Sequence, residues 1–203
     1  MHIAEGVLSA PVLISGAAMA AFGTAVGYRK LDYESIPQVA VLSAAFFIAA
    51  LIHVPIGPSS VHLILNGLMG LLLGWVAFPA ILVGLLLQAI LFQYGGLTSL
   101  GVNTVTMAVP AVICFYMFRA GVRNEKTGIC LASAFLCGSL SVLLGSLLVA
   151  LALVSTGEAF FTIAKVIVVA HIPIMIIEGI ISAACVKFLK KVKPEILEVI
   201  YAD

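Results

Sequence analysis

The first two residues of the chain, Met1 and His2, bring three nitrogen donors together. A free terminal amine has a reference pKa of about 8, and neutral imidazole is the commonest protein metal ligand near neutral pH. The amine, the backbone nitrogen of His2 and the Nδ1 atom of its ring can form fused chelate rings around one ion. A deprotonated amide in such a set suits a square-planar ion, and tetragonal nitrogen sites favour Ni(II) or Cu(II), with Co(II) also accepted.

These donors are available only if Met1 carries a free amine. A cleaved signal peptide has a basic leader and a small-residue cleavage site, but no Lys or Arg precedes Ala10. We therefore expect the first hydrophobic stretch to be retained and Met1 to be the N-terminus.

One more imidazole would complete four nitrogens, and His62 is the candidate that we favour. It stands in "GPSSVHLILNG", at the expected start of a helix that Ser59 and Ser60 can cap. Two ordinary interpretations compete with this hypothesis. A terminal histidine is commonly solvated, and a histidine at a helix end commonly caps the helix or lies at the membrane interface.

The composition predicts an all-α integral membrane protein. Hydrophobic residues make up 63% of the 203 and charged residues 9%, whereas a soluble domain is about half apolar and a quarter charged. The apolar runs lack the alternation of an outer-membrane barrel. Since a spanning helix needs about 20 apolar residues, we expect about seven transmembrane helices in a single domain, 1–203. The expected spans are 7–27, 38–56, 60–77, 79–94, 104–120, 128–154 and 159–189.

The positive charges predict how the chain faces the membrane. With seven spans, nine of the ten Lys and Arg residues fall on one side, and the exception is Lys165. Cytoplasmic loops carry an excess of Lys and Arg, so we expect the N-terminus outside and the C-terminus inside, with 187–203 as a cytoplasmic tail. The protein is then a multi-pass protein of the cell's inner (cytoplasmic) membrane, with His2, His53 and His62 on the outer side.

The sequence also excludes several functions. It contains no G-x-x-x-x-G-K-[ST] motif, so we expect no ATP to bind this chain through a P-loop. It contains no HExxH motif and no Ser-His-Asp arrangement, so we expect a non-enzymatic protein. The four cysteines lie in apolar stretches without a C-x-x-C motif, which favours packing over metal binding.

Other polar residues lie inside the expected spans. His171 and Glu178 are seven residues apart and share a helix face. They predict either an inner polar relay, or a contact that senses a docked partner, or a paired structural group between helices. Pro173 between them should bend the helix. Gln88 and Gln93 are typical of hydrogen bonds between membrane helices.

Four motifs, in order, resemble the CbiM/NikM family: "MHIAEG", "SSVH", "GGLTSLGVNT" and "HIPIMIIEG". This family comprises the substrate-binding membrane subunits of energy-coupling-factor transporters for cobalt and nickel. The resemblance implies a seven-helix unit whose N-terminal segment, 1–6, enters the core and chelates the ion. It implies the Met1 amine, the amide and imidazole nitrogens of His2 and the His62 imidazole as ligands. Many relatives have a proline after the histidine matched to His62, where this chain has "LILNG", so His53 is the rival fourth ligand.

The resemblance further implies supporting residues and partners. We expect Glu5 to anchor the N-terminal segment by accepting hydrogen bonds, and Thr98 and Asn103 to support the site from the glycine-rich loop. The ion is the transported substrate, Ni(II) or Co(II), with a link to cobalamin biosynthesis. The partners would be a transmembrane coupling subunit, ATPase subunits and a small accessory membrane subunit, with no nucleic acid. The alternatives are a stand-alone secondary carrier of divalent metals and a structural membrane subunit.

Overall fold

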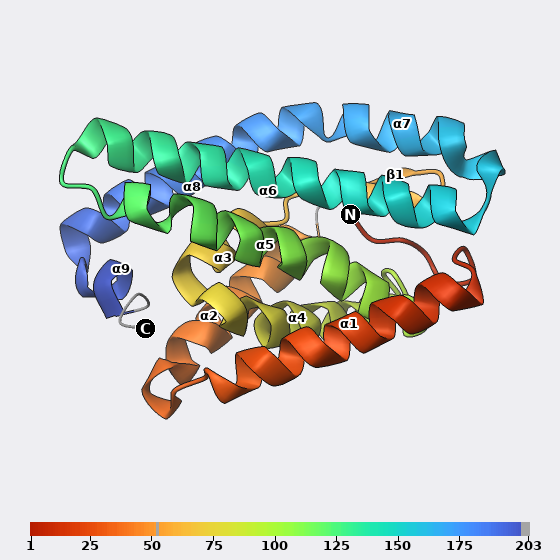
Figure 1. The fold of residues 1–203 in the computed structure, drawn as a ribbon, viewed down its shortest axis with the longest axis horizontal. Helices are drawn as coiled ribbons and strands as arrows, with labels where there is room; N and C mark the ends of the chain where they lie inside the picture. The colour runs from red at the N-terminus through yellow and green to blue at the C-terminus, as the bar shows by residue number, and fades with distance from the viewer. Residues whose placement is uncertain (52, 200–203) are drawn as a thin grey trace.

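Long apolar helices make up most of the chain, and the N-terminal segment runs into the space between them (Figure 1). The computed structural model describes residues 1–51 and 53–199. The α-helices are α1 Ala10–Arg29, α2 Ile36–Ala49, α3 Asn66–Leu73, α4 Ala77–Phe92, α5 Leu100–Val122, α6 Thr127–Thr156, α7 Phe161–Ala170, α8 Ile172–Val192 and α9 Glu195–Val199. The strands are β1 His53–Ile56 and β2 Ser59–His62. The short 3-10 helices are η1 Tyr33–Ser35, η2 Gly74–Val76 and η3 Glu158–Phe160.

The predicted class, a helical integral membrane protein, is confirmed. Five helical stretches are long and apolar enough to cross a membrane, and the shorter stretch Tyr33–Ala49 is apolar as well. The expected count of seven spans is not confirmed by these lengths. The five stretches are Ala10–Arg29, Asn66–Phe92, Leu100–Val122, Thr127–Thr156 and Glu158–Val192.

A β-hairpin replaces the predicted helix ends around the second and third expected spans. We expected helices over 38–56 and 60–77, but β1 and β2 pair antiparallel, with His53 opposite His62. The turn between the strands contains Gly57, whose φ is +55°, followed by a proline that cannot continue a helix. Ile3 forms an isolated bridge with Ser59, so the N-terminal segment lies against the hairpin like a third strand.

The chain reverses between α3 and α4. Gly70 packs on Ala111 and Gly74 on Phe115, so α3 runs in the same direction as α5. The α4 helix runs the opposite way, since Gln88 near its end returns to the N-terminal segment. With eight residues, α3 is about 12 Å long, which is too short to cross a membrane core of about 30 Å. It therefore completes a crossing only together with the hairpin that precedes it.

The third and fourth expected spans, 60–77 and 79–94, meet beside Pro79, but the chain does not reverse at this proline. Pro79 stands in the first turn of α4, where its missing N–H would have no helical partner in any case. The reversal occurs at Gly74, whose φ is +54°. The last expected span, 159–189, is also divided, because α7 ends and α8 begins on either side of His171. This break lies two residues before Pro173, where the sequence predicted a bend.

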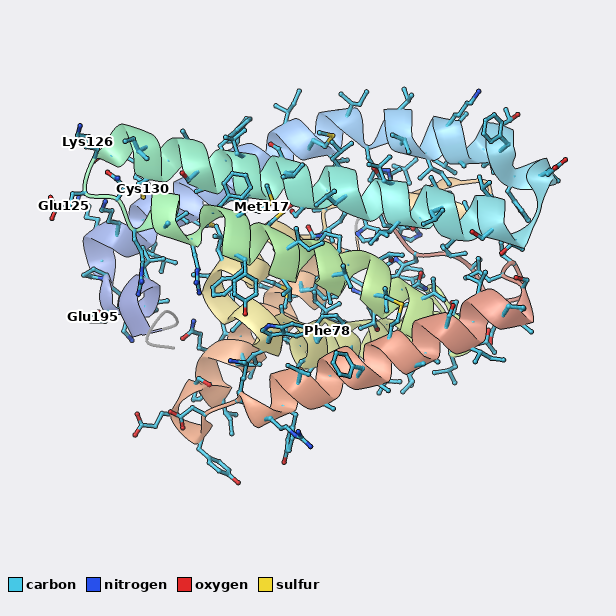
Figure 2. All side chains as sticks on the ribbon, viewed as in Figure 1. Phe78, Met117, Glu125, Lys126, Cys130 and Glu195 are labelled. Atoms are coloured by element: carbon cyan, nitrogen blue, oxygen red, sulfur yellow. The ribbon has the colours of Figure 1, made fainter. Side chains whose placement is uncertain are left out.

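Glycines on α1 allow this helix to approach its neighbours closely. A Cβ atom added to Gly16 would lie 2.9 Å from the Cα atom of Val102 on α5. Gly23 faces the ring of Phe78 on α4, which Figure 2 shows between the two helices. The close contact of α1 with α4 and α5 forms one wall of the space that the N-terminal segment occupies.

The basic residues gather at one end of the bundle. Lys30 and Arg119 line one cavity there, and the Nζ atom of Lys190 donates to the backbone oxygen of Asn124 at 2.7 Å. Figure 2 shows Lys126 at the same end, in the connection from α5 to α6. The opposite end carries the connections from α4 to α5 and from α6 to α7 (Figure 1).

The chain that follows the last membrane helix is partly helical. We expected a tail over 187–203, but α8 continues to Val192 and α9 covers Glu195–Val199. Residues 200–203 lie outside the described residues. All four cysteines are free, and Cys114, Cys130 and Cys137 are buried, as packing residues are.

Candidate metal site

Met1 and His62 meet in the interior of the bundle. Met1 and His62 are 0% and 2% exposed, and the terminal amine is hydrogen bonded to Nε2 of His62. The other ring nitrogen of His62, Nδ1, lies 2.7 Å from the backbone oxygen of Leu63. A carbonyl oxygen only accepts, so Nδ1 carries the proton and Nε2 directs its lone pair at the amine. This tautomer leaves Nε2 free to bind a metal ion.

The short contact between the amine and Nε2 is the geometry that neighbouring ligands of one ion need. A metal–nitrogen bond to imidazole is about 2 Å long. Two such ligands at right angles therefore lie roughly 2.8 Å apart, which is a hydrogen-bonding separation. The amine and His62 can become adjacent ligands with little movement of either.

The ring of His2 is held by Gln88, a residue that the sequence assigned to hydrogen bonds between membrane helices. Nε2 of His2 lies 2.8 Å from Oε1 of Gln88, and Nε2 of Gln88 donates to the backbone oxygen of Phe47 at 3.0 Å. The bond to Phe47 fixes the amide so that its oxygen faces His2. His2 therefore donates from Nε2 and keeps the lone pair on Nδ1, the atom that a chelate with the terminal amine requires.

The two imidazole rings lie face to face. The ring centroids of His2 and His62 are 4.5 Å apart and the planes differ by 25°. The three nitrogen donors of residues 1 and 2 and the ring of His62 thus border the same small space.

The backbone of Ile3 is clamped by the start of α5. Its N–H donates to Oδ1 of Asn103 at 2.8 Å, and its oxygen accepts from Nδ2 of the same amide at 3.1 Å. The hydroxyl of Ser99 lies 3.0 Å from the oxygen of Ile3 and 2.7 Å from that of Gly95. Asn103 was predicted as a supporting residue, whereas Ser99 was not. Ser99 is the serine within "GGLTSLGVN" and could have been found by its helical spacing of four from Asn103.

Glu5 and Thr98 meet at the mouth of the site. The backbone N–H of Thr98 donates to Oε1 of Glu5 at 3.3 Å, and both residues are exposed. A Cβ atom added to Gly96, whose φ is +99°, would lie 2.6 Å from the Cβ atom of Glu5. The glycine therefore lets this loop fold closely over the N-terminal segment. Thr98 thus contributes its backbone N–H to this contact.

The rival histidine, His53, faces a different neighbour. It is half-buried and its Nδ1 atom lies 3.2 Å from the backbone oxygen of Leu51. Its ring meets that of Tyr94 edge to face, with the centroids 4.2 Å apart. The structure thus brings Met1, His2 and His62 together, while the ring of His53, the cross-strand partner of His62, packs on Tyr94.

Burial keeps the donors uncharged. Desolvation lowers the pKa of the Met1 amine well below its usual value, against an opposing effect of the Glu178 carboxylate. Desolvation, and then repulsion by the amine, lower the pKa of His62 and bring the pKa of His2 to about 3. A lone pair that carries no proton is what a metal ion needs, and these lowered pKa values favour unprotonated nitrogens.

Glu178 supports the turn that follows His62. Its Oε1 atom accepts from the backbone N–H groups of Ile64 at 2.5 Å and Leu65 at 2.9 Å. Leu65 has a φ of +55°, which an L-residue adopts only where the surroundings hold it. Within residues 1–51 and 53–199, no three His, Cys, Asp or Glu side chains gather as a metal cluster.

Comparisons with known proteins identify the family of the chain. The family profile of CbiM, described as a cobalt uptake substrate-specific transmembrane region, matches residues 2–196. A putative metal transport protein of Haemophilus influenzae is 43% identical over 97% of both chains. The cobalt transport protein CbiM of Kyrpidia tusciae is 33% identical over 97% of this chain and 86% of its own.

Two solved structures share the fold. Each is described as a transition metal transporter, and one of them is truncated. The TM-scores are 0.78 and 0.76, at 24% identity, over 99% and 94% of this chain and 98% and 99% of theirs.

The helical fold and these relatives define a multi-pass membrane protein of the transition-metal transport class. The chain belongs to the CbiM family of cobalt and nickel uptake components, and the resemblance that its motifs predicted is confirmed. A relative at 28% identity over 98% of this chain and 68% of its own, from Archaeoglobus fulgidus, is named a putative fused nickel transport protein NikMN. The metal is thus a transported substrate of the family.

Proposed function

We propose that the chain binds Ni(II) or Co(II) through four nitrogens in one plane. The ligands are the Met1 amine, the backbone nitrogen and Nδ1 of His2, and Nε2 of His62. The observation that carries this proposal is the contact of the buried amine with Nε2 of His62, beside a His2 ring whose Nδ1 keeps its lone pair. In metal-free protein the amine proton occupies the place between two nitrogens that the ion would take.

The surrounding residues act on the ligands rather than on the ion. Gln88 sets the tautomer of His2, Asn103 fixes the backbone of Ile3, and Glu5 ties the N-terminal segment to the loop over it. Such outer partners orient the ligands and commonly tune metal affinity 10–100-fold, a rough range. His53 serves the hairpin and is not a ligand in this proposal.

The proposed role is the substrate-specific subunit of an energy-coupling-factor transporter for ATP-driven uptake. A transmembrane coupling subunit and ATPase subunits would supply the energy, with a small accessory membrane subunit, and this chain would bind no ATP. The whole chain, 1–203, forms one transmembrane domain in the inner membrane. The basic end that contains Lys30, Arg119 and Lys190 faces the cytoplasm, so the metal site opens outward and the C-terminus lies inside.

A stand-alone secondary carrier is the second candidate. It is favoured by one observation, the fully buried pair His171 and Glu178 within the last expected span, because carriers place ionisable groups near the middle of the membrane. Uptake that persists after removal of the ATPase subunits would favour this carrier, and uptake that stops would favour the energy-coupling-factor role.

The coordination geometry is tested by spectroscopy. The purified full chain is loaded with one equivalent of Ni(II) or of Co(II), and absorption and magnetic susceptibility are measured. Strong-field nitrogens in one plane pair the electrons of Ni(II), so a yellow, diamagnetic complex is expected. A paramagnetic octahedral nickel centre would contradict the four-nitrogen site and favour an oxygen-rich one, for instance at Glu5 and Asn103.

A further inference from the structure

One face of α8 and the residue before it carries three buried polar side chains. His171, Glu178 and Ser182 are each 0% exposed. Their spacings of seven and four residues place them on one side of a helix. From His171 to Ser182 this face extends roughly 16 Å, at about 1.5 Å per residue. A polar stripe therefore leads away from the metal site along the last long helix.

Each of the three side chains keeps an atom without a hydrogen-bond partner. These atoms are Nε2 of His171, Oε2 of Glu178 and Oγ of Ser182, three of the five such buried atoms within the described part of the chain. Buried polar atoms nearly always have a partner, and a carboxylate oxygen left alone is costly. A bound ion or water at these three atoms would therefore stabilise the stripe.

The other polar atoms of these side chains are fixed. Nδ1 of His171 donates to the backbone oxygen of Ile167 at 2.7 Å, so Nε2 carries a free lone pair. Oε1 of Glu178 is held by the turn after His62. The orientation of both side chains is thus set by bonds that leave one ligating atom available on each.

The stripe begins beside the proposed ligands and points to the basic end. Oε1 of Glu178 accepts from the backbone N–H groups of Ile64 and Leu65, two and three residues after His62. In the other direction α8 continues to Lys190, which bonds the connection between α5 and α6. Imidazole nitrogen and carboxylate oxygen both bind divalent transition metals.

We propose that this stripe is a transit site for the divalent cation, in which Nε2 of His171 and Oε2 of Glu178 offer ligands to the ion one after the other once it leaves the planar site. Ser182 supplies the next oxygen toward the basic end. The proposal rests on the proposed function, since it needs a metal at the N-terminal site. One or two protein ligands completed by water bind weakly, and an ion in passage must be bound weakly enough to leave.

The test uses Mn(II) as a probe of the stripe, after the N-terminal site has been filled with Ni(II). The full chain is loaded with one equivalent of Ni(II) and titrated with Mn(II), and the electron paramagnetic resonance signal of free Mn(II) is measured. We expect one further, weak Mn(II) site. Glu178→Gln keeps an oxygen for the turn after His62 but replaces Oε2, so Mn(II) affinity should fall about tenfold or more.

Two further variants complete the test. His171→Ala should lower Mn(II) affinity without touching the turn that Glu178 holds. Glu158→Gln, which removes an exposed carboxylate, should leave it unchanged. A wild-type chain that takes up Ni(II) but no Mn(II) would overturn the transit site and assign the stripe to water. A chain that binds no Ni(II) at all would instead contradict the proposed function, and the Mn(II) titration would still report on the stripe.

Discussion

The N-terminal segment and the inner face of α8 both bury polar groups, but they satisfy them differently. In the segment, the terminal amine, the ring of His2 and the backbone of Ile3 all have hydrogen-bond partners. On α8, His171, Glu178 and Ser182 each keep one atom unpaired. A fully paired network specifies one geometry, which suits an ion bound in a defined plane. Polar groups without hydrogen-bond partners are stabilised by a bound ion in more than one arrangement, which suits an ion in passage.

The strongest way to break the N-terminal network is to alter the amine itself. A residue added before Met1, or acetylation of the amine, removes a ligand and places extra atoms where Met1 is fully buried. Equilibrium dialysis should show loss of Ni(II) or Co(II) affinity well beyond the roughly 100-fold upper range for outer partners. A tag added after Asp203 is the control and should have no effect. Unchanged affinity in the blocked chain would exclude the terminal amine as a ligand.

The second comparison separates the two histidines of the hairpin. His62→Ala removes the lone pair that faces the amine, so affinity should fall by about 100-fold or more. His53→Ala removes a ring that packs on Tyr94 and should change affinity only slightly. Isothermal titration calorimetry of both variants measures this difference. A larger loss in His53→Ala would mean that the hairpin presents the other histidine to the ion.

A substitution of Gln88 tests whether the hydrogen bond to the His2 ring affects metal affinity, since Gln88 is not itself a proposed ligand. Gln88→Leu should release the His2 ring from its tautomer, and metal affinity should fall roughly 10–100-fold. The matched control is Gln38→Leu, a glutamine whose amide bonds the backbone of Leu72 near the basic end. If both variants bind metal equally well, Gln88 only joins helices through hydrogen bonds, as the sequence alone suggested.

The last comparison concerns the number of protons that metal binding releases. The pKa values of the amine, His2 and His62 are lowered by burial, so these groups are already deprotonated near neutral pH and release no proton when the ion binds. Only the backbone amide of His2 must lose one, so affinity should rise about tenfold per pH unit between roughly pH 5 and 8. Calorimetry in buffers of different ionisation enthalpy counts the protons. A count of two or three would show that the donors are protonated before the ion arrives.

The sequence predicted the helical membrane class and the family, because long apolar runs and the motif order are local features. It did not predict the hairpin at His53–His62, since a Pro-Ile-Gly-Pro stretch between apolar residues looks like two helix ends. The pairing of Gln88 with His2 could not be predicted either. It depends on the reversal at Gly74, which brings α4 back past the terminus. Nor did the spacing of His171 and Glu178 reveal that Glu178 supports the turn after His62, because that contact joins residues 114 positions apart.

The buried terminus also determines when the site can form during folding. The bonds that position it join Met1 to His62, His2 to Gln88 and Ile3 to Asn103, at sequence separations of 61, 86 and 100 residues. Contacts between such distant residues form late, because the intervening chain must be ordered first. The first residues to be synthesised are therefore among the last to reach their places, after α4 and α5 have packed. An ion that binds only the finished arrangement would stabilise that last step by mass action.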